Sequence, residues 1–123
     1  MSGRFFGAGL AFALALAAGH AALAQDRIKI GVITDKVGAA KFYAEPVTEG
    51  IVLGAKEINA KGGILGKQIE LLIEDDQNKP DVSAAKARKL VDDGVVLFMS
   101  NTASTATQQA ETVSLETKTP QYS

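Results

Sequence analysis

Short apolar runs alternate with amphipathic segments along residues 28–122 of the sequence. Residues 28–33 alternate at first and then become continuously apolar, which is typical of a central strand covered on both faces. After a loop over residues 36–42, apolar residues recur at spacings of four, four and three, at Val47, Ile51, Ala55 and Ile58. This spacing predicts a helix with one apolar face.

Turn residues mark the ends of this helix. Pro46 suits its first turn, because proline lacks the N–H that the first turn leaves unpaired. Residues 59–63 end with Gly62 and Gly63, and glycine readily adopts the left-handed conformation that closes a helix. A second strand is expected at residues 68–74.

The second half of the sequence repeats the pattern. A helix is expected from Pro80 to Asp93, ending at Gly94, and the unbroken apolar run 95–99 predicts a buried strand. Ser104 or Thr105 then begins a third helix, whose apolar line is Ala106, Ala110 and Val113. Residues 120–123 have the character of the start of a fourth strand.

This order of elements predicts an α/β fold with a parallel sheet, right-handed crossovers and helices on both faces. In a flavodoxin-like strand order 2-1-3-4, the chain reverses direction between the first and third strands. A crevice then opens at their carboxyl ends. We therefore expect a ligand to lie between residues 34–43 and residues 100–105.

The N-terminus predicts export. Arg4 precedes an apolar run over residues 5–18, which is too short to span a membrane, and Ala22-Leu23-Ala24 has the small-residue pattern of a cleavage site. We expect a signal peptide over residues 1–24, cleaved after Ala24, and a periplasmic mature domain over residues 25–123. The alternative is a buried apolar helix.

Composition narrows the chemistry. The chain has no cysteine and one histidine, His20, which cleavage removes, so Ser-His-Asp and Cys-His catalysis and His/Cys zinc sites are excluded from the mature chain. Its charge is 12 minus 14, or −2, because cleavage also removes Arg4 from the 13 basic residues. We expect a small-molecule partner rather than nucleic acid, and no cofactor, metal or catalytic residue. Asp75 and Asp76 are interpreted as solvated carboxylates at a strand end.

Two features remain as candidate binding groups. Residues 100–105 are small and rich in hydroxyls, and they lie between a buried strand and a helix N-terminus, where unpaired N–H groups favour an anion. Alternatively, Ser104 or Thr105 only caps its helix. Phe42 and Tyr43 either pack the loop onto the sheet or form a stacking wall for a ligand.

Residues 50–64 carry a resemblance, most specifically in Ile58-Asn59-Ala60-Lys61-Gly62-Gly63-Ile64. The sequence from residue 27 to 123 resembles type I periplasmic binding proteins of ABC transporters, in the branched-chain amino acid receptor branch. The resemblance implies a two-lobed clamp, of which this chain supplies an incomplete first lobe.

The same resemblance implies that the ligand's carboxylate binds at Thr102, Ala103, Ser104 and Thr105, with Tyr43 also contributing. Where the family often has Ser-Gly-Pro and Tyr-Gly, this sequence has Val37-Gly38-Ala39 and Tyr43-Ala44. Relatives with such altered loops include receptors for aromatic acids and amides.

These observations lead to one main hypothesis and several alternatives. The main hypothesis is a receptor, not an enzyme, that binds a branched-chain amino acid or a similar small carboxylate and delivers it to an ABC transporter permease. One alternative is a receptor for aromatic carboxylates or amides. Alternatives of another class are a secreted hydrolase lacking histidine and a truncated product without function.

Overall fold

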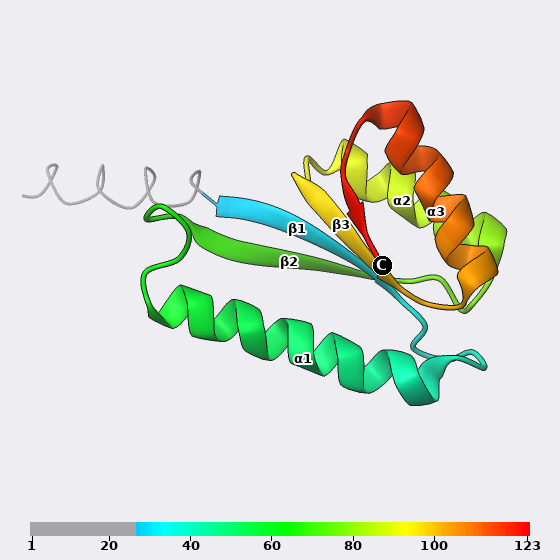
Figure 1. The fold of residues 1–123 in the computed structure, drawn as a ribbon, viewed down its shortest axis with the longest axis horizontal. Helices are drawn as coiled ribbons and strands as arrows, with labels where there is room; N and C mark the ends of the chain where they lie inside the picture. The colour runs from blue at the N-terminus through cyan, green and yellow to red at the C-terminus, as the bar shows by residue number, and fades with distance from the viewer. Residues whose placement is uncertain (1–26) are drawn as a thin grey trace, which may run out of the picture.

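The computed structural model describes residues 27–123 as strands and helices in strict alternation (Figure 1). The predicted signal peptide lies outside these residues. The elements are β1 (Arg27–Thr34), α1 (Lys41–Ala60), β2 (Gln68–Asp75), α2 (Pro80–Asp92), β3 (Leu97–Asn101), α3 (Ser104–Thr117) and β4 (Gln121–Tyr122). Among the described residues, no helix is both long enough and apolar enough to cross a membrane.

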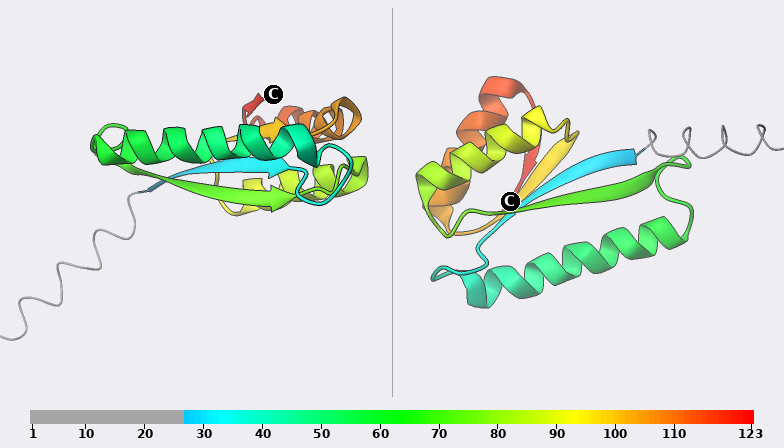
Figure 2. Two further views of the ribbon diagram at one scale, coloured as in Figure 1. Left: turned by 90° about the horizontal axis from the view of Figure 1, so that it is seen from below. Right: turned by 180° about the vertical axis from the view of Figure 1, so that it is seen from behind.

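The four strands form one parallel sheet in the order β2-β1-β3-β4, which confirms the predicted topology. Helix α1 lies over one face, and α2 and α3 pack together on the other (Figures 1 and 2). Thr34, the last residue of β1, is paired with Asp75 on one side and with Asn101 on the other. The carboxyl ends of the three longer strands therefore meet at one edge of the sheet.

Helix α1 begins earlier than predicted. It starts at Lys41, so the expected loop over residues 36–42 is too long and Pro46 lies inside the helix. Ala40 is the N-cap, and its carbonyl accepts hydrogen bonds from the N–H groups of Tyr43 and Ala44, both at 3.1 Å. Pro46 is tolerated because the N–H that it lacks would have bonded to the carbonyl of Phe42, close to the exposed start of the helix.

Strand β3 is shifted by two residues from the predicted range 95–99 and covers Leu97–Asn101. Val95 still belongs to the turn that closes α2, because its N–H donates to the carbonyl of Leu90 at 3.2 Å. Val96 makes the first contact with β1, through an N–H that donates to the carbonyl of Lys29 at 2.9 Å. Val95 is therefore buried against the end of α2, Val96 is 55% exposed, and pairing with β1 begins at Leu97.

The main core lies between the sheet and the pair of helices α2 and α3. Its buried members are Ile33, Ala87, Leu90, Val95, Phe98, Ala110 and Val113. Gly31 in β1 allows the helix to approach, because a Cβ at this position would lie 2.7 Å from Cδ1 of Leu90 and 2.9 Å from Cβ of Phe98. The predicted apolar line of α3, Ala106, Ala110 and Val113, is fully buried.

The face covered by α1 is less tightly packed. An apolar gap of about 210 Å³ lies between the helix and the sheet, lined by Ile30, Ile51, Gly54, Ala55, Ile58, Ile69, Leu71 and Met99. Leu53 and Val47 of α1 are exposed. The sheet therefore has one closely packed face and one that is partly open.

Candidate functional site

The predicted binding segment, residues 102–105, covers the connection from β3 to α3 and the first two residues of α3, at the carboxyl edge of the sheet. Helix α3 begins at Ser104, and its N-cap is Ala103, which has φ −64° and ψ 152° and no side-chain capping bond. The interpretation of Ser104 or Thr105 as the capping residue is therefore wrong. Both hydroxyl-bearing residues are exposed in the first turn, where backbone N–H groups have no partner within the helix.

Thr102 differs from the residues that follow it. Its side chain is buried, and its hydroxyl donates a hydrogen bond to Oδ1 of Asp76 at 3.1 Å. The carbonyl of Thr102 accepts a longer bond, of 3.4 Å, from the hydroxyl of Thr107. The Thr102 hydroxyl is thus engaged inside the protein, whereas Ser104 and Thr105 face solvent.

Tyr43 lies in the first turn of α1 rather than at the end of a loop. Its ring packs edge-on against Phe42, with centroids 5.1 Å apart and planes at 88°. Phe42 is 80% exposed and Tyr43 is 38% exposed, so the pair does not pack the loop onto the sheet. An exposed apolar pair beside the sheet edge is available to a ligand or to another surface.

Asn101 connects the first turn of α1 to the end of β3. Its Nδ2 donates to the carbonyl of Ala44 and to the hydroxyl of Thr48, both at 3.0 Å. The residue after Tyr43 is therefore in contact with the residue before Thr102. The fold thus brings both parts of the predicted site to the same edge.

Asp35 shapes the loop that precedes Tyr43. Its carboxylate is buried and accepts N–H bonds from Val37 at 3.2 Å, from Gly38, and from Ala40 at 2.7 Å. A Cβ at Gly38 would lie 2.7 Å from both carboxylate oxygens, so only glycine fits against Asp35. The carboxylate thereby satisfies three backbone donors and fixes the start of α1.

Asp76 lies where the loops that follow β1, β2 and β3 meet. Contrary to the expectation of a solvated carboxylate, it is fully buried: its N–H donates to the carbonyl of Thr34 at 3.0 Å, and its Oδ1 accepts a bond from the buried hydroxyl of Thr102. Sequence analysis missed the roles of Asp35, Asp76 and Asn101. An aspartate directly after a strand and three residues before a glycine is typical of a side chain that organises a turn, and it was the available signal for Asp35.

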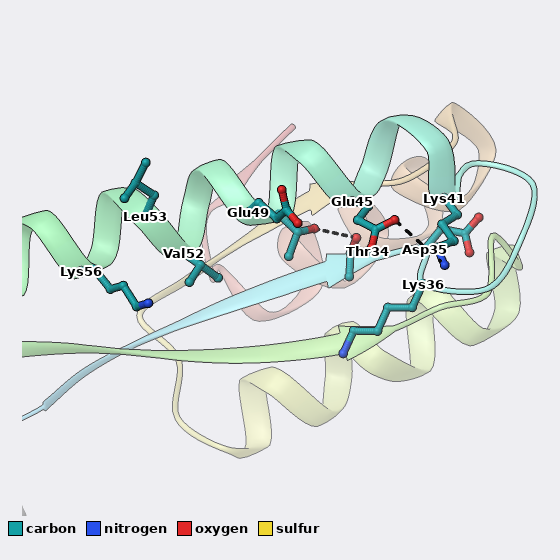
Figure 3. Close-up of a pocket in the computed structure, with 10 residues that line it drawn as sticks. Thr34, Asp35, Lys36, Lys41, Glu45, Glu49, Val52, Leu53 and Lys56 are labelled. Atoms are coloured by element: carbon teal, nitrogen blue, oxygen red, sulfur yellow. Dashed lines mark hydrogen bonds and ion pairs between the residues drawn. The ribbon is translucent and has the colours of Figure 1, made fainter.

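A groove of about 440 Å³ runs along α1 from Lys41 to Lys56 (Figure 3). It is lined by Thr34, Asp35, Lys36, Lys41, Glu45, Thr48, Glu49, Val52, Leu53 and Lys56. Four of these residues belong to the expected range 34–43, but Tyr43 and residues 102–105 are not among them. Lys41 and Glu45 form an exposed ion pair of 4.0 Å across one turn. The lining holds three lysines and three carboxylates, so its charges alone do not favour an anion, and residues 102–105, with the first-turn N–H groups of α3, remain the candidate for binding a carboxylate.

In open parallel α/β sheets, small molecules bind in the crevice at the carboxyl edge, which is where this chain places the exposed Ser104 and Thr105. The comparisons with known proteins make this more specific. Residues 27–122 match the model of a family described as periplasmic binding protein, and the chain belongs to this family.

Similar proteins bear names that refer to branched-chain amino acids. The Leu/Ile/Val-binding protein of Escherichia coli K12 is 35% identical over 104 residues, which are 85% of this chain and 28% of that protein. The leucine-, isoleucine-, valine-, threonine- and alanine-binding protein of Pseudomonas aeruginosa is 35% identical over 101 residues, 80% of this chain and 27% of that protein. The chain thus spans little more than a quarter of these relatives.

A solved structure shares the fold. The branched-chain amino acid transporter substrate-binding protein LivJ of Streptococcus pneumoniae, in complex with isoleucine, superposes with a TM-score of 0.74 and 31% identity. The match covers 77% of this chain and 28% of the LivJ chain. The predicted family and fold class are confirmed.

Proposed function

We propose that this chain supplies the first lobe of an extracytoplasmic receptor that binds a branched-chain amino acid, or a similar small carboxylate. The receptor would deliver its ligand to the permease of an ABC transporter. The observation that carries the proposal is the uncapped, exposed start of α3 at the carboxyl edge of the sheet. The names of the relatives support the class of ligand.

The start of α3 has the chemistry that a carboxylate requires. Its first-turn N–H groups point along the helix axis, and the helix dipole adds a partial positive charge at the same end. The hydroxyls of Ser104 and Thr105 can donate further hydrogen bonds, while Thr102 and Ala103 would contribute only main-chain groups. Membership of a periplasmic binding protein family agrees with the proposed signal peptide over residues 1–24 and a periplasmic location.

A second candidate ligand class is an aromatic carboxylate or amide. The exposed edge-to-face pair of Phe42 and Tyr43 favours this class, because aromatic side chains stack on aromatic ligands. In the main proposal, Tyr43 instead covers the aliphatic side chain of the bound amino acid.

The site of this chain is open on one side, because Ser104, Thr105 and Phe42 face solvent. Hydrogen bonds of a solvated carboxylate contribute about 0.5–1.5 kcal/mol each, and association costs roughly 4–15 kcal/mol. We therefore expect weak binding by residues 25–123 alone and strong binding only when a second lobe closes over the ligand.

The test is calorimetry with leucine, isoleucine, valine and benzoate on two proteins. One is this chain, and the other is a chimera in which residues 27–122 replace the matching segment of the Escherichia coli relative. Saturable binding of an aliphatic amino acid by the chimera alone supports the main proposal, and preference for benzoate supports the second. A folded chimera that binds neither contradicts both, and turnover of an ester panel would indicate a hydrolase.

A further inference from the structure

The carboxylate of Asp76 lies where the loops after β1, β2 and β3 meet. Its main-chain N–H donates to the carbonyl of Thr34 at the end of β1. Its Oδ1 accepts one bond from the N–H of Asn78 at 2.9 Å and another from the hydroxyl of Thr102 at 3.1 Å. This single residue therefore connects three consecutive strand ends.

The position is unfavourable for a charged group. Asp76 is fully buried, its Oδ2 has no hydrogen-bond partner among the described residues, and the buried hydroxyl of Ser83 faces the carboxylate without a bond of good geometry. Burial raises the pKa of the Asp76 carboxyl, and the N–H of Asn78 and the two hydroxyls oppose this rise only in part. A buried carboxylate with one unpaired oxygen costs folding free energy.

The bond to Thr102 explains what the carboxylate achieves. Thr102 directly precedes Ala103, whose extended backbone turns the chain into α3. A fixed Thr102 leaves little freedom to the peptide units of Ala103 and Ser104, and these units carry the first free N–H groups of the helix. Asp76 thus acts on the exposed end of α3 through a residue that is itself buried.

We propose that Asp76 is a positioning residue of the binding site: by holding the Thr102 hydroxyl, it sets the direction of the N–H groups that receive the ligand's carboxylate. The part that concerns the ligand rests on the proposed function, whereas the effect on the backbone does not. Asp76 itself touches no ligand. The neighbouring Asp75 provides the contrast, because its Oδ1 accepts bonds from the N–H groups of Lys36 and Gln77 and contributes none to the β3–α3 loop.

The first experiment needs no ligand. Amide hydrogen exchange and ¹⁵N chemical shifts of residues 103–107 are measured by NMR in the full chain and in four variants, namely Thr102→Val, Thr102→Ser, Asp76→Asn and the control Asp75→Asn. Thr102→Val keeps the shape but removes the hydroxyl, so we expect exchange of the Thr107 amide, which bonds to the carbonyl of Ala103 at 2.9 Å, to rise about tenfold, the effect of losing one hydrogen bond. Thr102→Ser keeps the hydroxyl and is expected to restore protection.

Asp76→Asn keeps an acceptor oxygen, so we expect it to raise amide exchange less than Thr102→Val does. Asp75→Asn is expected to leave the exchange of residues 103–107 as in the parent protein. Unchanged exchange of the Thr107 amide in Thr102→Val would overturn the proposal. An equal rise throughout α2 and α3 would also overturn it, because that result describes a general loss of stability. If Thr102→Val does not fold, the comparison of Asp76→Asn with Asp75→Asn decides between the same outcomes.

The second experiment measures affinity for leucine in the chimera that carries the same substitutions. We expect Thr102→Val to weaken binding about tenfold and Thr102→Ser to restore it. If the parent chimera binds no ligand, the proposed function fails while the exchange result still tests the positioning role. If the exchange changes but affinity does not, residues 103–105 do not bind the ligand through these N–H groups, and the ligand part of the proposal is overturned.

Discussion

Asn101 at the end of β3 holds Ala44 in the first turn of α1, through a hydrogen bond of 3.0 Å from Nδ2 to the main-chain carbonyl. The same amide group also donates to the hydroxyl of Thr48. This contact, rather than the sheet ladder, attaches the start of α1 to the strand that leads into the binding segment. It is the basis of the first prediction.

Asn101→Ala is expected to lower the free energy of unfolding by about 1–2 kcal/mol, because two partly buried hydrogen bonds are lost and the hydroxyl of Thr48 keeps only its other partners. Urea unfolding followed by circular dichroism measures the change. Thr112→Ala is the control, because that exposed hydroxyl bonds only within α3. Equal unfolding midpoints for Asn101→Ala and the parent chain would show that the contact contributes nothing.

Gly31→Ala is expected to destabilise the fold by roughly 1–3 kcal/mol, since the new methyl group would overlap Leu90 and Phe98 in the closely packed core. Gly50→Ala in α1 is the matched control, because no atom lies within 4 Å of its Cβ position. There we expect a stabilisation of about 0.5–1 kcal/mol from the higher helix propensity of alanine. Thermal unfolding measures both changes: we expect a lower midpoint temperature for Gly31→Ala and a higher one for Gly50→Ala. A shift of both midpoints in the same direction would contradict this account.

Glu74 provides a prediction on pH. Its carboxylate accepts bonds from Lys86 at 2.7 Å and from Lys89 at 2.6 Å, and these bonds hold the pKa of Glu74 below its ordinary value of 4.5. The unfolded chain then binds the proton more readily than the folded chain. The stabilisation is therefore fully present above the unfolded pKa and is lost as the pH falls through the lowered folded pKa.

Urea midpoints of the parent chain and of Glu74→Gln, measured between about pH 7 and about pH 3, test this dependence. We expect the difference in urea midpoint between the parent chain and Glu74→Gln to become smaller as the pH is lowered. Asp76 is present in both proteins, so the comparison cancels its contribution to the pH dependence of stability. That contribution has the opposite sign, because the pKa of Asp76 is raised. Glu116→Gln is the control, because its exposed pair with Arg88 is worth only about 0–1 kcal/mol. A difference that stays constant with pH would exclude the role given to Glu74.

Ser104→Ala is expected to weaken leucine binding by the chimera by about 1.5–3 kcal/mol, the usual effect of removing a hydrogen bond to a charged group. Stability should change little, because Ala103 and not Ser104 is the N-cap. Ser114→Ala, on the same helix and far along it, is the control and should leave affinity unaltered. Unchanged affinity in Ser104→Ala would remove its hydroxyl from the proposed carboxylate site.

Much of the fold could be predicted because it depends on local patterns. The strand order follows from the alternation of strands and helices, and Gly62, Gly63 and Gly94 all have the positive φ that a helix end requires. The start of α1 could not be predicted in this way, because it depends on Asp35, whose carboxylate holds the N–H of Ala40 five residues further on.

The candidate site was predicted only in part, for a related reason. The exposed hydroxyls of Ser104 and Thr105 follow from their place before an apolar helical pattern. The hydrogen bond between Asp76 and Thr102 joins residues 26 positions apart, which come together only once the parallel strands are paired. Polar contacts between loops of different strands leave no periodic signal in a sequence.

Pro46 has a mechanical consequence for α1. Since Pro46 cannot donate a hydrogen bond to the carbonyl of Phe42, the first turn is joined to the rest of the helix by one bond fewer than a continuous helix would have. Asn101 attaches this same turn to β3. Because Asn101 also bonds to the hydroxyl of Thr48, it holds the helix on both sides of Pro46, and Tyr43 would keep its place relative to the end of the sheet when the far end of α1 moves.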